Sequence, residues 1–177
     1  MPFTLVLTRK PNDLFHHWSG HGRFGTLIVF KGEKITEAQI LDGQGSAGSI
    51  TVPSGVLEVK SSGSVEEVAR YTTIERMDGY VQLRPRPTPY TVTYEMNNPV
   101  VAKLKHGGNC FRVHGGQTKP EQGILIHEAP HVGWLIGCIG PRKLDDKSLD
   151  CDTALKAVVD LHKHIGAARA DFFVLDW

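Results

Sequence analysis

Short runs of β-branched and aromatic residues recur along the chain, separated by segments rich in glycine, proline and polar residues. Alternating or continuous apolar runs of this length are typical of strands. The prolines and glycines between them favour turns. Strands are therefore predicted over residues 3–7, 25–30, 35–41, 50–59 (two strands around a Pro-Gly turn), 80–83, 90–94, 110–114, 124–126 and 172–175.

One segment near the end has helical spacing instead. Its apolar positions are Leu155, Val158, Val159, Leu161 and Ile165, with Ser148 or Asp150 as the expected N-cap and Gly166 as the expected end. A second, shorter helical turn is predicted over 65–70 after Ser64, and residues 16–22 are predicted to be a polar loop. The order is many strands, one late helix and a last strand, which indicates a mainly β fold with a small α component.

Length and charge narrow the class of protein. The 177 residues are most simply one domain, 1–177. Lys and Arg number 20 against 19 Asp and Glu, which argues against a nucleic-acid partner because such a protein needs a basic face. No apolar run approaches the roughly 20 residues of a membrane span. The first nine residues do not resemble a signal peptide, so the sequence leaves the compartment open.

The most informative segment runs from Gly123 to Gly140. A β-branched run ends at His127, and Cys138 follows eleven residues later, directly after Gly137. A thiol and an imidazole can form a nucleophile–base pair. Gly137 would let a substrate approach the backbone, and amides near it could stabilise an oxyanion. Cys138 and His127 are therefore the candidate catalytic residues, with the pKa of Cys138 expected to be lowered by the imidazole.

Other interpretations of these residues stay open. Cys138 could be a buried structural cysteine. His114, which also ends an apolar run before a glycine, is a rival base or an orienting residue. Arg142 could hold a substrate carboxylate or lie in solvent. Cys110 and Cys151 are expected to be structural, and the histidines at 16, 17 and 21 are expected to lie in a solvated loop rather than bind a metal.

Residues His127 to His131 also match the zinc-protease pattern H-E-x-x-H. That pattern needs a helix, on which histidines four residues apart share a face. A strand-like run precedes His127, and Pro130 would break the helix. We therefore expect a non-helical segment, no metal ligands and no cofactor here.

The ordered pattern Gly-Ile-x-Ile-His, eleven residues, Gly-Cys-Ile resembles the DUF5675 family of bacteria and phages. That family is similar in motif to the L,D-transpeptidase (YkuD-like) cysteine enzymes of peptidoglycan. Residues 26–29 and 52–59, the late helix and the closing strand resemble it more loosely. Glu128-Ala129-Pro130 departs from the usual Pro-Gly-Asn, and Leu135-Ile136 replaces the Ser/Thr-His of the transpeptidases.

The resemblance implies an L,D-transpeptidase-like β-sandwich or barrel with one C-terminal helix. It implies acyl transfer on peptidoglycan stem peptides by Cys138, with His127 as the base, as a transpeptidase or a carboxypeptidase. Such an enzyme would act in the periplasm or on the cell wall, and a phage or a secretion system could deliver it. A non-catalytic module associated with a phage or a secretion system is the alternative. The sequence identifies neither a delivery partner nor an immunity protein.

Overall fold

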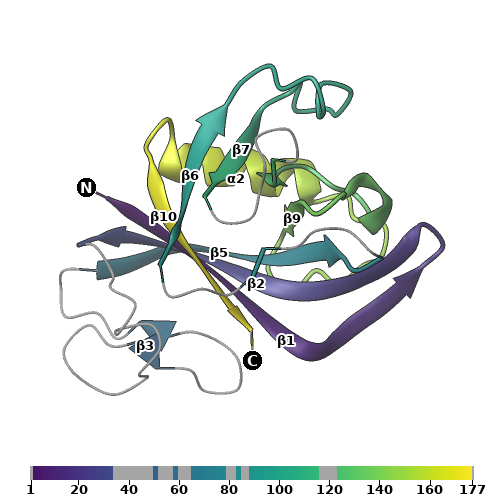
Figure 1. Cartoon of the computed structure of the whole chain (residues 1–177), viewed down its shortest axis with the longest axis horizontal. Helices are drawn as coiled ribbons and strands as arrows, with labels where there is room; N and C mark the ends of the chain where they lie inside the picture. Colours follow the sequence, from purple (N-terminus) through teal and green to yellow (C-terminus); the bar gives the residue numbers. More distant parts are fainter. Residues whose placement is uncertain are drawn as a thin grey trace.

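The computed structural model describes residues 2–33, 50–51, 58–59, 65–78, 83–84, 88–115 and 123–176. Within them, eight strands form a closed barrel in the order β1-β10-β6-β7-β8-β9-β5-β2 (Figure 1). The fold is thus a mainly β, mixed barrel with one C-terminal helix. The barrel strands are β1 (Phe3–His17), β2 (Gly20–Gly32), β5 (Val65–Arg76), β6 (Tyr90–Glu95), β7 (Cys110–His114), β8 (Leu125–Ile126), β9 (Ile139–Arg142) and β10 (Ala170–Asp176). The remaining elements are β3 (Ile50–Thr51), β4 (Glu58–Val59), the 3-10 helix η2 (Val132–Trp134) and helix α2 (Ala154–Ile165).

Two parallel pairings distinguish this barrel from a simple meander. β10 runs parallel to β1, from Phe3 opposite Ala170 onward, and antiparallel to β6. β8 runs parallel to β9, with Ile126 opposite Ile139. The other neighbours in the barrel are antiparallel. The first and last strands therefore close the sheet, and the segment from β8 to β9 crosses over outside it.

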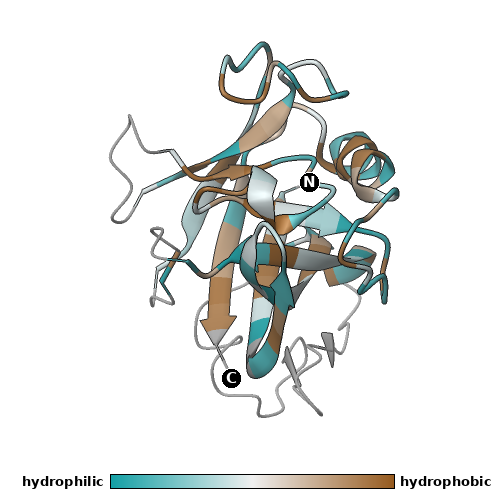
Figure 2. Cartoon of the chain, turned by 90° about the vertical axis from the view of Figure 1, so that its right-hand side faces the viewer, coloured by the Kyte–Doolittle hydropathy of each residue, from teal (hydrophilic) through white to brown (hydrophobic). Residues whose placement is uncertain are grey.

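The barrel interior is filled by alternate residues of the strands. Leu5 and Leu7 of β1 belong to the main core cluster, whereas Val6 belongs to a second cluster on the other face. β10 is buried on both faces in the same way, with Phe172 inside and Phe173 outside, and Figure 2 shows it brown over most of its length. This alternation of faces is the normal consequence of the period of two along a strand.

Helix α2 packs its apolar side against the main core. Ala157, Leu161 and Ile165 of the helix are buried in the same cluster as the barrel residues. Tyr71 of β5 donates a hydrogen bond from its hydroxyl to Asp160 of the helix at 2.7 Å. Burial of this tyrosine, together with that contact, raises its pKa.

A buried ion pair lies at the polar end of the barrel. Arg9 is in phase with Leu5 and Leu7 on β1 and is 1% exposed. Its Nε and Nη2 contact the two carboxylate oxygens of Glu75 on β5, each at 2.7 Å. Its Nη1 donates to the carbonyl of Leu83 at 2.7 Å. The bidentate geometry satisfies both charges away from water.

The strands predicted at 90–94, 110–114 and 172–175, the late helix and its end at Gly166 are confirmed. The helix begins after Thr153, so the predicted caps Ser148 and Asp150 are wrong. The helical turn at 65–70 is also wrong, because these residues pair with β2 as part of β5. The expected strand at 35–41 lies outside the described residues, as does most of 80–83.

The polar loop predicted at 16–22 is instead the end of a long hairpin. β1 continues to His17 and β2 begins at Gly20, with a two-residue turn between them. Within the part of the chain that the structure describes, no helix has the length and apolar character needed to cross a membrane.

Candidate functional site

The parallel pair β8–β9 is flanked by His127, directly after β8, and by Cys138, directly before β9. The amide of His127 donates to the carbonyl of Ile139 at 3.0 Å, which extends the ladder beyond Ile126 opposite Ile139. Ile126 and Ile139 belong to the main core inside the barrel. Leu125 and Cys138 belong to a third cluster, on the outside of the barrel, which we call the outer cluster. Because side chains alternate along a strand, His127 lies on the same outer face as Cys138.

The ring of His127 is held in one tautomer. Its Nδ1 lies 2.7 Å from the carbonyl oxygen of Glu128. A carbonyl accepts and does not donate, so Nδ1 carries the hydrogen and Nε2 has a free lone pair. The side chain is 3% exposed, and burial lowers its pKa. His127 is therefore a neutral imidazole with its basic nitrogen at Nε2.

The thiol of Cys138 has different partners. The amide of Leu125 donates to its Sγ at 3.4 Å, and the thiol donates to the carbonyl of Ile136 at 3.8 Å. Cys138 is 6% exposed and belongs to the outer cluster with Phe24, Ile74, Val101, Cys110, Leu125, Ala129 and Leu135. Burial raises its pKa, although the amide of Leu125 and the charge of Arg112 oppose that change.

The expected lowering of the Cys138 pKa by an imidazole is therefore wrong for this structure. The ring of His127 uses Nδ1 on its own neighbouring carbonyl, and the sulfur makes its hydrogen bonds to Leu125 and Ile136. The two residues share a face, and no hydrogen bond joins them among the described residues. Desolvation in the apolar outer cluster is therefore the main influence on the pKa of the thiol.

Gly137 supplies the turn into β9. Its φ of 77° lies in the left-handed region, where residues with a side chain are strained. This turn places the carbonyl of Ile136 against the sulfur of Cys138, two residues further along. Gly137 thus shapes the backbone around the thiol, whatever binds there.

Arg142 is fully buried, and its guanidinium donates hydrogen bonds to carbonyls of the protein itself. Its Nη1 donates to the carbonyl of Ser148, and Nη2 to that of Pro130 at 3.5 Å. Burial lowers the pKa of this guanidinium. Arg142 thus ties together the segments before and after β9 through Nη1 and Nη2, whereas its buried Nε has no hydrogen-bond partner among the described residues.

The cation that acts on Cys138 is Arg112 of β7, which no sequence motif indicated. Arg112 lies opposite Leu125, and its charge acts on both Cys138 and Cys110. Its Nε and Nη2 contact the carboxylate of Glu95 at 2.5 and 3.1 Å. Its spacing of two from His114 is the signal that could have found it, because both fall on the outer face of one strand.

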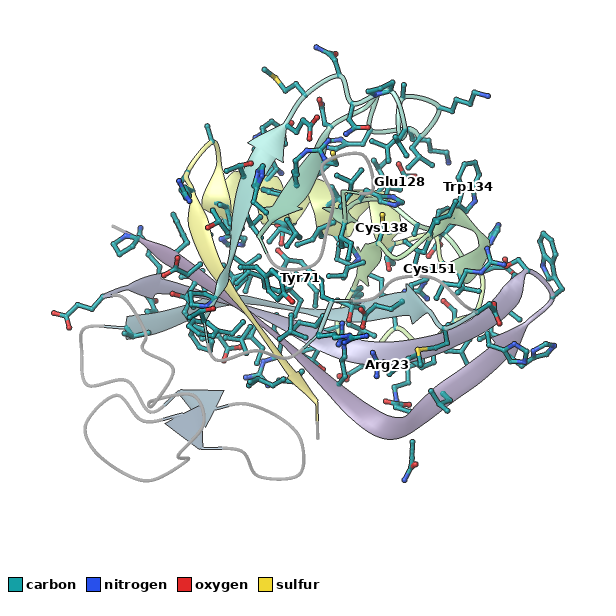
Figure 3. All side chains as sticks on the ribbon, viewed as in Figure 1. Arg23, Tyr71, Glu128, Trp134, Cys138 and Cys151 are labelled. Atoms are coloured by element: carbon teal, nitrogen blue, oxygen red, sulfur yellow. The ribbon has the colours of Figure 1, made fainter. Side chains whose placement is uncertain are left out.

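His114 lies further along β7 and is exposed. Its Nε2 is 2.6 Å from the hydroxyl of Thr93 on β6. Cys110, at the other end of β7, is buried, and burial together with the charge of Glu95 raises its pKa to about 12. The thiol of Cys151 contacts Asp146 and Thr153, each at 3.1 Å. Figure 3 shows Cys138, Glu128 and Trp134 in the segment around β9, and Cys151 nearby.

The segment from His127 to Pro130 is not helical, as predicted. It continues irregularly from β8, and His131 then caps η2 by accepting from the amide of Gly133 at 3.2 Å. Among the described residues, no group of three or more His, Cys, Asp or Glu side chains is arranged to hold a metal ion. The prediction that the histidines at 16, 17 and 21 lie in a solvated loop is wrong for His17. This residue is 4% exposed, and its Nε2 lies 3.3 Å from Oδ1 of Asp150.

Comparison with known proteins adds no assignment. No family model, no curated protein and no solved structure matches this chain. The site is therefore defined by its own residues.

Proposed function

We propose that this protein is a cysteine-dependent acyl-transfer enzyme acting on peptidoglycan stem peptides, similar to the DUF5675 and L,D-transpeptidase proteins. The observation that carries the proposal is that His127 directly follows β8 and Cys138 directly precedes β9, its parallel neighbour. The tautomer of His127 supports it, because Nε2 is the nitrogen left to accept a proton.

The reaction would begin from a neutral thiol and a neutral imidazole. Nε2 of His127 takes the proton of Cys138 while Sγ attacks the carbonyl before the terminal D-amino acid. The C–N bond then breaks, the leaving amine receives the proton from His127, and a thioester remains on Cys138. An amine completes transpeptidation, and water completes hydrolysis.

Two further groups favour this chemistry. The Leu125 amide already donates to Sγ, and a charge-assisted bond of this kind strengthens as the sulfur becomes a thiolate. Arg112 adds a positive charge that acts on the same sulfur. Its side chain is 26% exposed and is paired with Glu95, so a substrate carboxylate would compete with Glu95 for this guanidinium.

The test is incubation with muropeptides that carry tetrapeptide stems, followed by mass analysis of the products. The parent protein should release the terminal D-amino acid or exchange it for an added amine. Cys138→Ala and His127→Ala should give no product, whereas His114→Ala should retain most of the turnover. Product formation by Cys138→Ala would overturn the proposal.

A second candidate is a binding or structural module that retains this fold without catalysis. The burial of Cys138 in the outer cluster, at 6% exposure, favours it. This alternative predicts that parent and Cys138→Ala bind muropeptides equally well and that neither converts them. Titration of both proteins with the same stem peptides therefore separates the two functions.

A further inference from the structure

Two imidazoles converge on one hydroxyl at the tip of the β1–β2 hairpin. Ser19 lies in the two-residue turn between His17 and Gly20. Its Oγ is 2.6 Å from Nδ1 of His17 and 3.2 Å from Nδ1 of His131, which lies in the segment between β8 and β9. The Nε2 of His17 is 3.3 Å from Oδ1 of Asp150. The Asp150 carboxylate, the His17 imidazole and the Ser19 hydroxyl thus lie next to one another in that order.

The hydrogen bonds fix the direction of proton transfer. The amide of Ser19 donates to Nδ1 of His17 at 3.3 Å, so this nitrogen is an acceptor. The amide of Gly133 likewise donates to Nδ1 of His131. The Ser19 hydroxyl therefore donates its proton toward an imidazole. The Nε2 of His17 lies 3.3 Å from Oδ1 of Asp150 without the geometry of a hydrogen bond, so the three groups stand in the order of a serine nucleophile, its base and a carboxylate beside that base.

Ser19 is partly accessible, and exposed aromatic rings lie next to its neighbour His131. Ser19 is half-buried, whereas His17 is 4% exposed. Trp18 and Trp134 are 79% and 46% exposed, and both rings lie near that of His131, with centroid distances of 5.3 and 6.2 Å. A buried imidazole next to a partly accessible serine, with two exposed indole rings near His131, suits a ligand that carries a flat apolar group.

Gly133 allows this assembly to form. A Cβ at this position would lie 2.8 Å from the Cβ and 2.9 Å from the Oγ of Ser19. The segment carrying His131 and Trp134 therefore approaches the hairpin tip closely because residue 133 has no side chain.

We propose that Ser19 is the nucleophile of a second, esterase-type site, with His17 as its base and Asp150 as the residue that orients His17. The ligand class is an acyl ester with an aromatic or similarly flat group. Oγ attacks the ester carbonyl as its proton moves to Nδ1 of His17. The carbon–oxygen bond breaks, and the alcohol leaves with that proton. Water then hydrolyses the acyl-serine, which releases the carboxylic acid and restores Ser19.

The test uses a fluorophosphonate probe, in which the serine oxygen bonds to phosphorus and fluoride leaves. Intact mass should show one probe per chain, and peptide mapping should place it on Ser19. Ser19→Ala should lose the label. His17→Gln should react about 10²-fold more slowly, because a positioned base contributes 10²–10⁴-fold. Asp150→Asn should also be slower, and its carboxylate is 71% exposed, so the fold should tolerate it.

Two control variants distinguish Ser19 from an ordinary serine and from the Cys138 site. Ser148→Ala removes a serine whose hydroxyl bonds to Asp146 rather than to an imidazole, and its labelling should equal that of the parent. Cys138→Ala should keep the Ser19 label, so failure of the acyl-transfer proposal does not affect this one. An unlabelled Ser19 in the folded parent, or equal labelling rates in Asp150→Asn, His17→Gln and the parent, would overturn the inference.

Discussion

The two cysteines of the outer cluster hold their protons more tightly in the folded protein than in the unfolded chain. Burial raises the pKa of Cys138, and burial with the charge of Glu95 raises that of Cys110 to about 12. An unfolded thiol loses its proton near pH 8.5. Above that pH the unfolded chain binds fewer protons than the folded protein, so alkali favours unfolding.

We therefore expect the free energy of unfolding to fall as pH rises from about 8.5, by up to about 1.4 kcal/mol per pH unit for each thiol. Below that range both thiols are protonated in both states, and this contribution is constant. Urea unfolding between pH 7 and pH 10 measures the slope. Cys110→Ser should make it shallower, and a slope unchanged by that substitution would contradict the assignment.

His127 gives the opposite dependence at acid pH. Burial lowers the pKa of its imidazole, so the folded protein resists protonation that the unfolded chain accepts near pH 6.5. The contribution is present above that pH and is lost as pH falls toward the folded pKa. His127→Gln should flatten the fall in unfolding free energy between pH 7 and pH 5, although His106 and His131, whose pKa values burial also lowers, will leave part of it.

Sequence spacing pointed to His127 and Cys138 as candidates because both lie in one short segment around the β8–β9 pair. Arg112 and the Ser19 group could not be found in the same way. Arg112 lies opposite Leu125, whose amide donates to Cys138, and Ser19 lies 112 positions before His131. Contacts over such separations depend on register and on the bend of the hairpin, which local patterns do not encode.

At the scale of elements, the segment between β9 and α2 is organised by one carboxylate. Asp146 accepts from the hydroxyl of Thr153 at 2.7 Å, from the thiol of Cys151 at 3.1 Å and from the amide of Ser148 at 3.0 Å. Burial alone would raise its pKa, but these hydrogen bonds hold it well below its usual range. Thr153 is the N-cap residue of α2 and makes no side-chain cap bond. Its hydroxyl donates a hydrogen bond to Asp146 instead.

Asp146→Ala should therefore loosen the start of α2 and lower stability by about 1–3 kcal/mol, because it leaves several donors without an acceptor. Hydrogen exchange should speed up in residues 146–157 more than in β1 or β2. Asp152→Ala is the matched control, since that exposed carboxylate lies beside the same helix start. Equal destabilisation by both substitutions would argue against a specific role for Asp146.

The spacing of apolar residues identified a helix or strand correctly where the buried side chains follow the period of that element. Val158, Leu161 and Ile165 recur at helical spacing and are buried on α2. The segment 65–70 misled because Val65 and Val68 are three apart, as on a helix, with a possible cap before them. Pairing with β2 over eleven positions outweighs that weak propensity.

For the whole molecule, the ion pair inside the barrel joins β1 to β5 across β2. Arg9 and Glu75 are 1% and 2% exposed. Removal of one partner leaves an uncompensated buried charge, which typically costs about 3–5 kcal/mol. Glu75→Ala should therefore lower the melting temperature strongly. Glu67→Ala, which breaks the partly exposed pair with Arg70 on the same strand, should cost about 0–1 kcal/mol.

Thermal unfolding of the parent and both variants checks this difference. A Glu75→Ala protein as stable as Glu67→Ala would show that the interior end of the barrel is hydrated enough to solvate Arg9.

The closure of the barrel itself could not be predicted from sequence patterns. A resemblance suggested a sandwich or barrel, but the alternation along each strand does not specify its neighbours.

The place of β10 between β1 and β6 has a consequence for how the chain matures during synthesis. β1 is made first, yet its parallel partner emerges last, so a nascent chain holds two unpaired edges until residues 170–176 leave the ribosome. Pairings over such long separations form slowly, and open edges recruit other chains. A ribosome stalled before Ala170 would therefore display an aggregation-prone sheet, and residues 170–176 end this exposure when they pair with β1 and β6.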